Sequence, residues 1–283
     1  CRDRPVVNPG LGGNGVETRV VRAKIIAIKR MRGGSGGSSL AVNLAVAAAA
    51  MRKRVALVDL DYSSGGDIAD MMGLAVDRDL GDALADERRD DKPDRRLAGY
   101  LIQHPSGVWV LAGPKRPDRV NAIQLEAVAS LIARLSNVYE ALVLDLPRTL
   151  GPSVLSVLDL CDSVILLVRP DVISIKNLRW ELEVLRLLKY PMHRTILVLN
   201  RVEHARITDS NISRAVGRRV DWALPWDAQV SDSIDSGTPY YLSNPRTPLA
   251  ERIRDLTASL IQGSGHGGNA SKTRLGGVIP FMR

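Results

Sequence analysis

The chain of 283 residues is poor in aromatic side chains and in cysteine, and each scarcity limits what it can be. Aromatic residues make up 4% of the sequence, so a core must be built mainly from Ala, Val, Leu and Ile, which suits a parallel sheet covered by helices. The two cysteines, Cys1 and Cys161, form neither a disulfide framework nor a CxxC metal pair. Cys161 stands in an apolar stretch and is predicted to be a small core residue.

Long hydrophobic runs are also absent, which argues against a membrane-spanning helix. We find no signal-peptide pattern, and we predict a cytoplasmic location, with polar or membrane association only through partners. Acidic residues are fewer than basic ones, the net charge is +8, and the excess lies mainly at the two ends. Basic ends of this kind suit nucleic acid or anionic lipid, and solvated tails are the simpler interpretation.

From Lys24 onwards, short aliphatic runs alternate with helical patterns. Strands are predicted at 24–29, 54–59, 108–111, 141–145, 163–168 and 195–200, and helices at 38–51, 121–136, 152–160, 173–188 and 247–262. Such alternation predicts right-handed crossovers and a three-layer α/β fold, a doubly wound, mainly parallel sheet flanked by helices. We expect a flexible basic lead-in at 1–22, one α/β domain at 23–262 and a flexible basic tail at 263–283. The charged stretch 86–96 is interpreted as a solvated loop.

A glycine-rich turn follows the first predicted strand and precedes a buried, Ala-rich helix. It reads Arg32-Gly33-Gly34-Ser35-Gly36-Gly37-Ser38-Ser39. Glycines let consecutive backbone N–H groups point at one anion, and the helix adds its positive end. A working P-loop has a lysine before its Ser or Thr, and here Gly37 stands at that position. A flexible linker or an ordinary strand-to-helix turn is the alternative interpretation.

Carboxylates follow two of the buried strands that we predict. Asp59 and Asp61 end one aliphatic run, and Asp145 ends another. In open α/β sheets the ligand binds beyond the carboxyl ends of the strands, so these acids should lie near the glycine-rich turn. Ser38, Asp59 and Asp145 are then candidate magnesium ligands, and Asp61 is a candidate for positioning a water at a γ-phosphate. In the alternative interpretation each acid caps the element that follows its strand.

Taken together, these residues resemble the deviant Walker ATPases of the ParA/MinD family over about residues 24–260. The family motif is lysine-Gly-Gly-x-Gly-lysine-Thr/Ser, and Leu40-Ala-Val-Asn-Leu-Ala45 after the loop is typical of it. The resemblance implies ATP or ADP with Mg²⁺ as ligands, held at the phosphates by the loop residues Gly33 to Ser39. It places Asn200, Arg201 and Pro225 at the base. It also implies a homodimer in which Arg32, at the first lysine of the motif, reaches the partner's phosphate.

Within that family, the sequence is similar to the CpaE/TadZ branch, which is linked to Flp/Tad pilus assembly and polar localisation. In that branch a small residue often replaces the loop lysine. Asp145-Leu-Pro147-Arg148 departs from the usual Asp-x-Pro-Ala-Gly, and Leu111-Ala-Gly-Pro114-Lys-Arg-Pro117 resembles the branch's proline-containing turn. Actinobacterial septum-site proteins with an altered loop look much alike and remain an alternative. Nitrogenase-type iron proteins share the expected fold but need paired cluster cysteines. Cys161 has no plausible mate in this sequence, so that branch is excluded.

We therefore expect a nucleotide-gated dimeric scaffold or localisation factor for pilus assembly, with weak or absent hydrolysis. The loss of one phosphate-stabilising cation costs roughly 10²–10³ in rate. Arg32 is the expected partial substitute. Lys29 or Arg30 could also compensate for that cation, although a position flanking the end of the strand is the preferred interpretation for both. Two alternatives stay open: an active ATPase that positions cellular cargo or a septum site, and a nucleotide-free interaction protein.

Partners other than protein are less favoured by the sequence. A basic cluster suits non-specific DNA, but no aromatic residues interleave to stack bases, so a solvated helix face is preferred; the cluster is Arg201, Arg206, Arg214, Arg218 and Arg219. The tail mixes basic and apolar residues, yet Gly276, Gly277 and Pro280 disfavour an amphipathic membrane helix. We expect a flexible or partner-docking tail without direct membrane contact.

Overall fold

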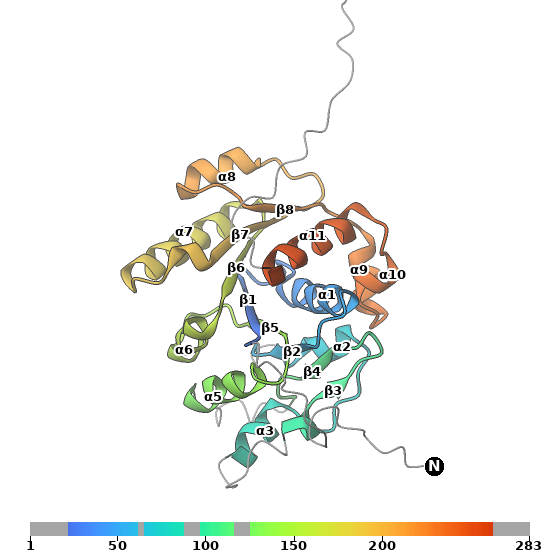
Figure 1. Ribbon diagram of the computed structural model, residues 1–283. Helices are drawn as coiled ribbons and strands as arrows, with labels where there is room; N and C mark the ends of the chain where they lie inside the picture. Colours follow the sequence, from blue (N-terminus) through green and yellow to red (C-terminus); the bar gives the residue numbers. More distant parts are fainter. Residues whose placement is uncertain (1–21, 62–64, 88–96, 116–124, 263–283) are drawn as a thin grey trace, which may run out of the picture.

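A computed structural model describes residues 22–61, 65–87, 97–115 and 125–262. Within these ranges the chain forms one eight-stranded sheet in the order β3-β4-β2-β5-β1-β6-β7-β8, with helices on both faces (Figure 1). Neighbouring strands run parallel, except that β3 and β4 are antiparallel. The predicted three-layer, doubly wound and mainly parallel sheet is confirmed. The segments expected to be the lead-in and the tail lie outside the described residues, apart from Arg22.

The middle of the sheet consists of aliphatic strands that helices cover on both faces. They are β1 (Lys24–Arg30), β2 (Val55–Asp59), β5 (Ala141–Leu146), β6 (Ser163–Val168) and β7 (Thr195–Asn200). Continuous Ile, Leu and Val runs are what a parallel strand buried on both faces requires. The bounds of β6 and β7 match the prediction, and each of the other three differs from it by one residue.

The edge strands are much shorter. They are β3 (Ile102–Gln103), β4 (Trp109–Leu111) and β8 (Trp222–Leu224). Only β4 was predicted, because two or three residues are too few to show a strand period. Of the described helices, none is long and apolar enough to cross a bilayer.

One face of the sheet is covered by a layer with α1 at its centre. The layer contains α1 (Gly37–Ala50), α2 (Asp67–Met71), α9 (Gln229–Asp235), α10 (Tyr240–Ser243) and α11 (Pro248–Gln262). As its Ala-rich sequence predicts, α1 is buried on every side from Leu40 to Ala48. The buried side-chain amide of Asn43 has a hydrogen-bond partner there, because its Oδ1 accepts from the Tyr241 N–H at 2.7 Å.

The opposite face carries a second layer (Figure 1). It contains α3 (Leu80–Glu87), α5 (Leu125–Leu135), α6 (Pro152–Leu160), α7 (Val172–Leu187) and α8 (Asp209–Val216), with 3-10 turns η3 (Leu97–Tyr100) and η4 (Met192–Arg194). Cys161 is buried after α6, as predicted, and burial raises the pKa of its thiol.

The short helices α2, α3, α8, α9 and α10 were not predicted, because segments of four to eight residues contain too few turns to show a helical period. The predicted loop at 86–96 is wrong at its start, since Asp86 lies in the last turn of α3. Its carboxylate accepts hydrogen bonds from Tyr100 and, at 3.3 Å, from Arg78. Residues 88–96 lie outside the described part of the chain.

The last two residues of β1 are cations that point to opposite faces of the sheet. Successive side chains of a strand alternate between faces. Ala27 packs in the core under α5 to α8, and Ile28 packs in the core under α1. By the same alternation Lys29 faces α7 and Arg30 faces α1.

Lys29 is 1% exposed and ties three elements together. Its Nζ lies 3.4 Å from Glu181 Oε1 on α7, and it donates to the carbonyl oxygens of Pro147 at 3.4 Å and of Arg148 at 2.5 Å. Burial lowers the pKa of Lys29 and raises that of Glu181, while their mutual attraction opposes both shifts. Lys29 therefore fixes the segment after β5 against α7.

Removing this buried cation should be costly. We expect Lys29→Met to lower the free energy of unfolding by about 3–5 kcal/mol, because it leaves the Glu181 carboxylate buried without its partner. The double variant Lys29→Met, Glu181→Leu should recover most of that loss. Urea denaturation measures both, with Lys176→Met on the exposed side of α7 as the control. A Lys29→Met loss as small as that of the control would contradict the expectation.

Candidate nucleotide-binding site

The glycine-rich turn between β1 and α1 depends on glycine for its backbone path. Gly34 and Gly36 have φ angles of 69° and 84°, in the left-handed region. At Gly36 an added Cβ would also lie 2.8 Å from Asn200 Nδ2, whereas Gly33 faces open space. Helix α1 begins directly afterwards at Gly37, and no described side chain caps its first N–H groups. These N–H groups and the positive end of α1 are available to an anion.

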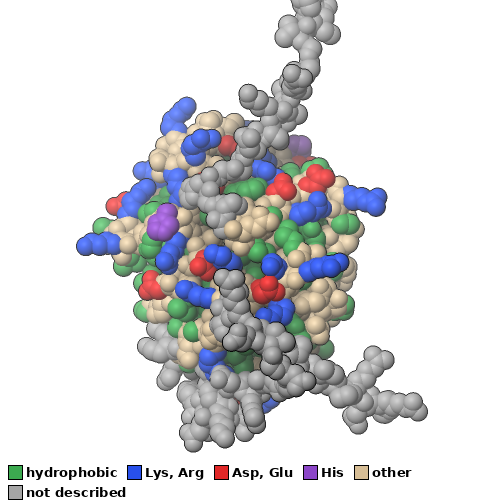
Figure 2. Space-filling view, in the orientation of Figure 1, with side chains coloured by type: hydrophobic (Ala, Val, Ile, Leu, Met, Phe, Trp, Pro, Cys, Tyr) green, Lys and Arg blue, Asp and Glu red, His purple; other side chains and the backbone are tan. Residues whose placement is uncertain are grey.

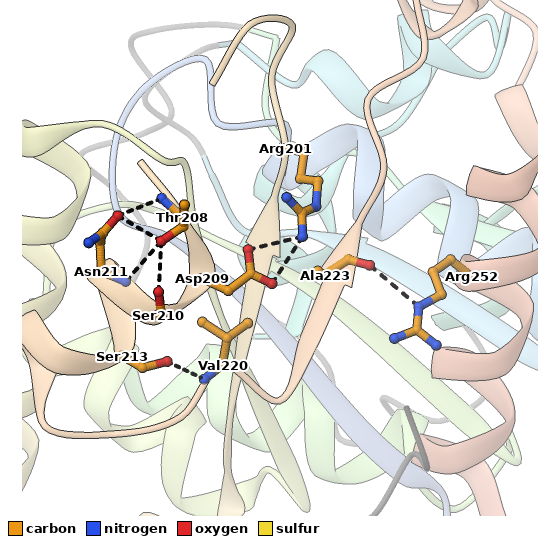
Figure 3. Close-up of polar contacts among 9 residues, drawn as sticks. All are labelled: Arg201, Thr208, Asp209, Ser210, Asn211, Ser213, Val220, Ala223 and Arg252. Carbon is orange, nitrogen blue, oxygen red and sulfur yellow. Dashed lines mark hydrogen bonds and ion pairs between the residues drawn. The ribbon is translucent and has the colours of Figure 1, made fainter. Parts of the chain in front are cut away.

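The carboxyl ends of β7 and β8 meet the loop. Asn200 donates through Nδ2 to the Ser35 carbonyl oxygen at 2.9 Å, which ties the end of β7 to the turn. The Arg201 N–H donates to the last carbonyl of β8 at 3.0 Å, next to Pro225. The Arg201 guanidinium pairs with Asp209 of α8 at 3.0 Å (Figure 3). Asn200, Arg201 and Pro225 thus lie at the same edge as the loop, with the Arg201 side chain held by α8.

Three carboxylates gather at this edge. Asp59, Asp61 and Asp145 are each 1% exposed. Asp59 and Asp145 are register partners on β2 and β5, and Asp59 Oδ1 accepts from the Asp61 N–H at 3.1 Å. Within the described chain, Asp59 Oδ2 and both carboxylate oxygens of Asp145 are buried and have no hydrogen bond of ordinary geometry. Buried carboxylate oxygens without partners are costly in a fold, so they indicate a site for an external cation.

Burial makes two of these acids hold their protons more tightly. It raises the pKa of Asp59 to about 8, and the neighbouring Asp145 charge adds to the effect. It raises the pKa of Asp145 to about 7, against the opposing effects of the Ser38 hydroxyl and the Arg30 guanidinium. A bound cation would favour the charged forms and lower both pKa values.

The donor set fits Mg²⁺ bound together with phosphate. The Ser38 hydroxyl at the start of α1 is close enough to Asp145 to lower its pKa, and Asp59 lies on the adjacent strand. Ser39, the next residue, is half-buried. The described residues include no group of three or more His, Cys, Asp or Glu side chains arranged to hold a metal by themselves. Mg²⁺ commonly keeps several waters and binds through few protein ligands plus phosphates, so such a group is not required.

Arg30, expected to flank the strand, instead reaches this site. Its side chain pairs with Asp61 and is 14% exposed. Its stem covers Gly37, where an added Cβ would lie 3.3 Å from Arg30 Cβ and 3.4 Å from Cδ. From the sequence, a position flanking the strand was preferred for Arg30 over a role in the site, although the alternation of β1 places Arg30 on the same face as Ile28 and therefore beside α1.

Arg32 takes a more exposed position than Arg30. Its side chain is 44% exposed and its Nη1 lies 3.5 Å from Asp171 Oδ1, at the N-cap of α7. Arg169, which the sequence did not single out, donates to the Gly34 carbonyl oxygen at 2.9 Å and also lies near Asp171, at 3.8 Å. The start of α7 thus braces the outer side of the loop.

Comparison with known proteins identifies the class to which this site belongs. A ParA family model, described as NUBPL iron-transfer P-loop NTPase, matches residues 21–261. The chain belongs to the ParA family of P-loop NTPases. An uncharacterised ATP-binding protein of Methanocaldococcus jannaschii is 28% identical over 240 residues, which are 83% of this chain and 87% of that protein.

Solved structures show the same fold. A ParA family ATPase from Chlorobium tepidum has a TM-score of 0.77 at 24% identity, over 84% of this chain and 98% of that chain. The septum site-determining protein MinD of Pyrococcus horikoshii, complexed with Mg-ADP, has a TM-score of 0.73 at 21% identity, over 86% of this chain and 98% of that chain. A nucleotide with Mg²⁺ is the ligand of this family.

The buried acids should make the nucleotide-free protein sensitive to pH. Because the folded-state pKa of Asp59 is raised, its contribution to stability is present at acidic pH and is lost as pH rises through about 8. We expect the melting temperature, measured with a chelator, to fall between about pH 5 and about pH 9, and to fall less in Asp59→Asn. The exposed Asp235→Asn is the control. If the melting temperature falls equally steeply with pH in the wild type and in Asp59→Asn, the ionisation of Asp59 does not destabilise the fold.

Proposed function

We propose that this protein binds ATP or ADP with Mg²⁺ at the turn between β1 and α1, and that the nucleotide controls its dimerisation. The observation that carries the proposal is the set of buried carboxylate oxygens on Asp59 and Asp145 that accept no hydrogen bond of ordinary geometry, beside the uncapped start of α1. A Mg²⁺-nucleotide would supply both ligands at once: its phosphates bind the N–H groups at the start of α1, and its Mg²⁺ binds the carboxylates. Ser38 and Asp145, with Asp59 behind them, would hold the ion.

Hydrolysis is proposed to be slow or absent. Gly37 supplies no ammonium at the position of the P-loop lysine, and one such cation is worth roughly 10²–10³ in rate. Asp61, the candidate for positioning a water, is paired with Arg30 in this structure. A carboxylate held by a guanidinium is a poorer partner for water, so binding survives these features better than turnover does.

The cellular role that we propose is a dimeric scaffold or localisation factor for Flp/Tad pilus assembly. Its support is the CpaE/TadZ-like sequence at two places, Asp145-Leu-Pro147-Arg148 and the turn Leu111 to Pro117. Arg32 supports the dimer, since it is exposed at the outer side of the loop, where a second subunit would meet it. Homodimers and protein partners of a pilus or polar machinery are the associations that this role requires.

Two other functions are weighed against this one. An active ATPase that positions cargo or a septum site has support from the MinD likeness, but Gly37 and the Arg30–Asp61 pair oppose rapid turnover. A nucleotide-free interaction protein would not need the buried acids to face the start of α1. We do not extend iron transfer to this chain, because Cys161 is buried and Cys1 is the only other cysteine.

DNA binding by the predicted basic cluster is not favoured. Two of its five arginines are already paired: Arg201 with Asp209 at 3.0 Å, and Arg218 with Asp221 at 2.9 Å. In Figure 2, Lys and Arg side chains are spread over the visible face with acids between them, and they do not gather into one patch. Phosphate binding by Arg201 or Arg218 would require these ion pairs to open.

The first experiment is titration calorimetry of the full chain with Mg-ATP and with Mg-ADP, with phosphate release and molecular mass followed in parallel. We expect binding of both nucleotides, little phosphate release, and dimers with ATP only. Rapid turnover would favour the active ATPase. An absence of binding would overturn the proposed function and favour a protein that acts through its surface alone.

Arg32 should separate dimerisation from binding. We expect Arg32→Ala to keep its affinity for ADP within about 3-fold, since the exposed Arg32–Asp171 pair contributes little, but to lose the ATP-dependent dimer. Arg206→Ala, an exposed arginine elsewhere, is the control. In cells lacking the protein, the wild type should restore Flp/Tad pili and Arg32→Ala should not. An ATP-dependent dimer that persists in Arg32→Ala would argue against gating through this residue.

A further inference from the structure

We propose that Arg30 is the phosphate-binding cation of this site, and that residue 37 is glycine because the Arg30 side chain occupies the space above it. This inference rests on the proposed nucleotide binding and deepens it. In place of a lysine in the loop, the charge that holds the phosphates comes from Arg30, the last residue of β1. Because Arg30 also pairs with Asp61, the carboxylate that would position a water stays engaged, and the slow hydrolysis proposed above still follows.

The other cations near the loop pair with carboxylates outside the buried acid cluster. Lys29 lies on the opposite face of the sheet, with Glu181. Arg32 and Arg169 both lie near Asp171, on the outer side of the loop. Arg30 pairs with Asp61 and its charge lowers the pKa of Asp145, so its guanidinium lies beside one of the buried acids that would hold the magnesium.

A side chain at residue 37 would press on the stem of Arg30. An added Cβ would lie 3.3 Å from Arg30 Cβ, which is tighter than an ordinary contact, and 3.4 Å from Cδ and 3.7 Å from Cγ, which are ordinary contacts. Gly37 is the first residue of α1 and its φ is not positive, so backbone conformation does not require glycine there. The close approach of Arg30 is the structural reason for a residue without a side chain.

The guanidinium can hold Asp61 and a phosphate together. Arginine has five N–H donors in a planar fork, so a pairing with one carboxylate leaves donors for a second acceptor. Asp61 fixes the side chain while the site is empty, which lowers the entropic cost of ordering it when the nucleotide binds. Arg30 therefore supplies charge and position, and Asp61 is its positioning residue.

A cycle of variants tests the pairing of Arg30 with Gly37. We expect Arg30→Met, which keeps the stem, to weaken Mg-ADP and Mg-ATP binding by about 10- to 100-fold, as for loss of a charged hydrogen bond. Gly37→Lys alone should also weaken binding, because the new side chain displaces Arg30. The double variant Arg30→Ala, Gly37→Lys should bind better than Arg30→Ala or Gly37→Lys alone, since the lysine then has room to reach the phosphates. Arg22→Met and Arg206→Met, at exposed arginines outside the site, are the controls and should change ADP affinity by less than about 3-fold.

A second measurement needs no nucleotide. Gly37→Ala should lower the melting temperature of the wild type, where the methyl group meets Arg30, and should raise it in an Arg30→Ala background, where only the better helix propensity of Ala remains. This readout stays informative if one binding variant is poorly folded.

The failure of this inference is distinct from the failure of the proposed function. If the wild type binds neither nucleotide, both are overturned. If the wild type binds and Arg30→Met binds as well, Arg30 is not the phosphate-binding cation and nucleotide binding stands without it. If the Gly37 and Arg30 substitutions are additive in both measurements, Arg30 is not the reason for glycine at residue 37.

Discussion

The site depends on the free-energy cost of burying charged side chains at the ends of three neighbouring strands, β2, β5 and β1. β2 and β5 place Asp59 and Asp145 side by side in the sheet, and both are almost fully removed from water. Like charges so close in a poorly solvated place either take up protons or require cations. The raised pKa values of both acids show the first response in the nucleotide-free chain. Mg²⁺ and Arg30 would provide the second, so the same pair that destabilises the empty fold makes it receptive to a Mg²⁺-nucleotide.

The loop and the acids are brought together by topology. In a parallel sheet the carboxyl ends of the strands share one edge, and each crossover helix returns from that edge. The turn after β1, the acids after β2 and β5, and Asn200 after β7 therefore converge although they are far apart in the sequence. Asn200 completes the arrangement, because its Nδ2 holds the Ser35 carbonyl oxygen at 2.9 Å and leaves no room for a side chain at Gly36.

Much of this could be predicted from the sequence, and the exceptions have physical reasons. The aliphatic runs of β6 and β7 indicate their bounds because burial on both faces leaves little choice of residue type. β3 and β8 escape prediction because two or three residues show no strand period, and the short helices because four to eight residues contain too few turns to show a helical one. Arg30 was misjudged for another reason. A cation at the end of a strand usually reaches water. That Arg30 lies two residues after Ile28, and therefore on the same face of the sheet, is the sign that it lies under α1. The roles of Arg32 and Asp61 remain predictions.

The two adjacent cations at the end of β1 also determine what an insertion or deletion within this strand would do to the protein. Lys29 secures α7 and the segment after β5, and Arg30 lies under α1. A shift of β1 by one residue would move each of them to the opposite face of the sheet. In one direction Lys29 would lie beside Gly37 and Ile28 would replace it against Glu181; in the other, Arg30 would lie against Glu181 and Met31 beside Gly37. An insertion or deletion within this strand would therefore damage stability and ligand recognition together. Selection for one of these properties consequently protects the other, and the length of β1 should vary far less than the lengths of the loops around it.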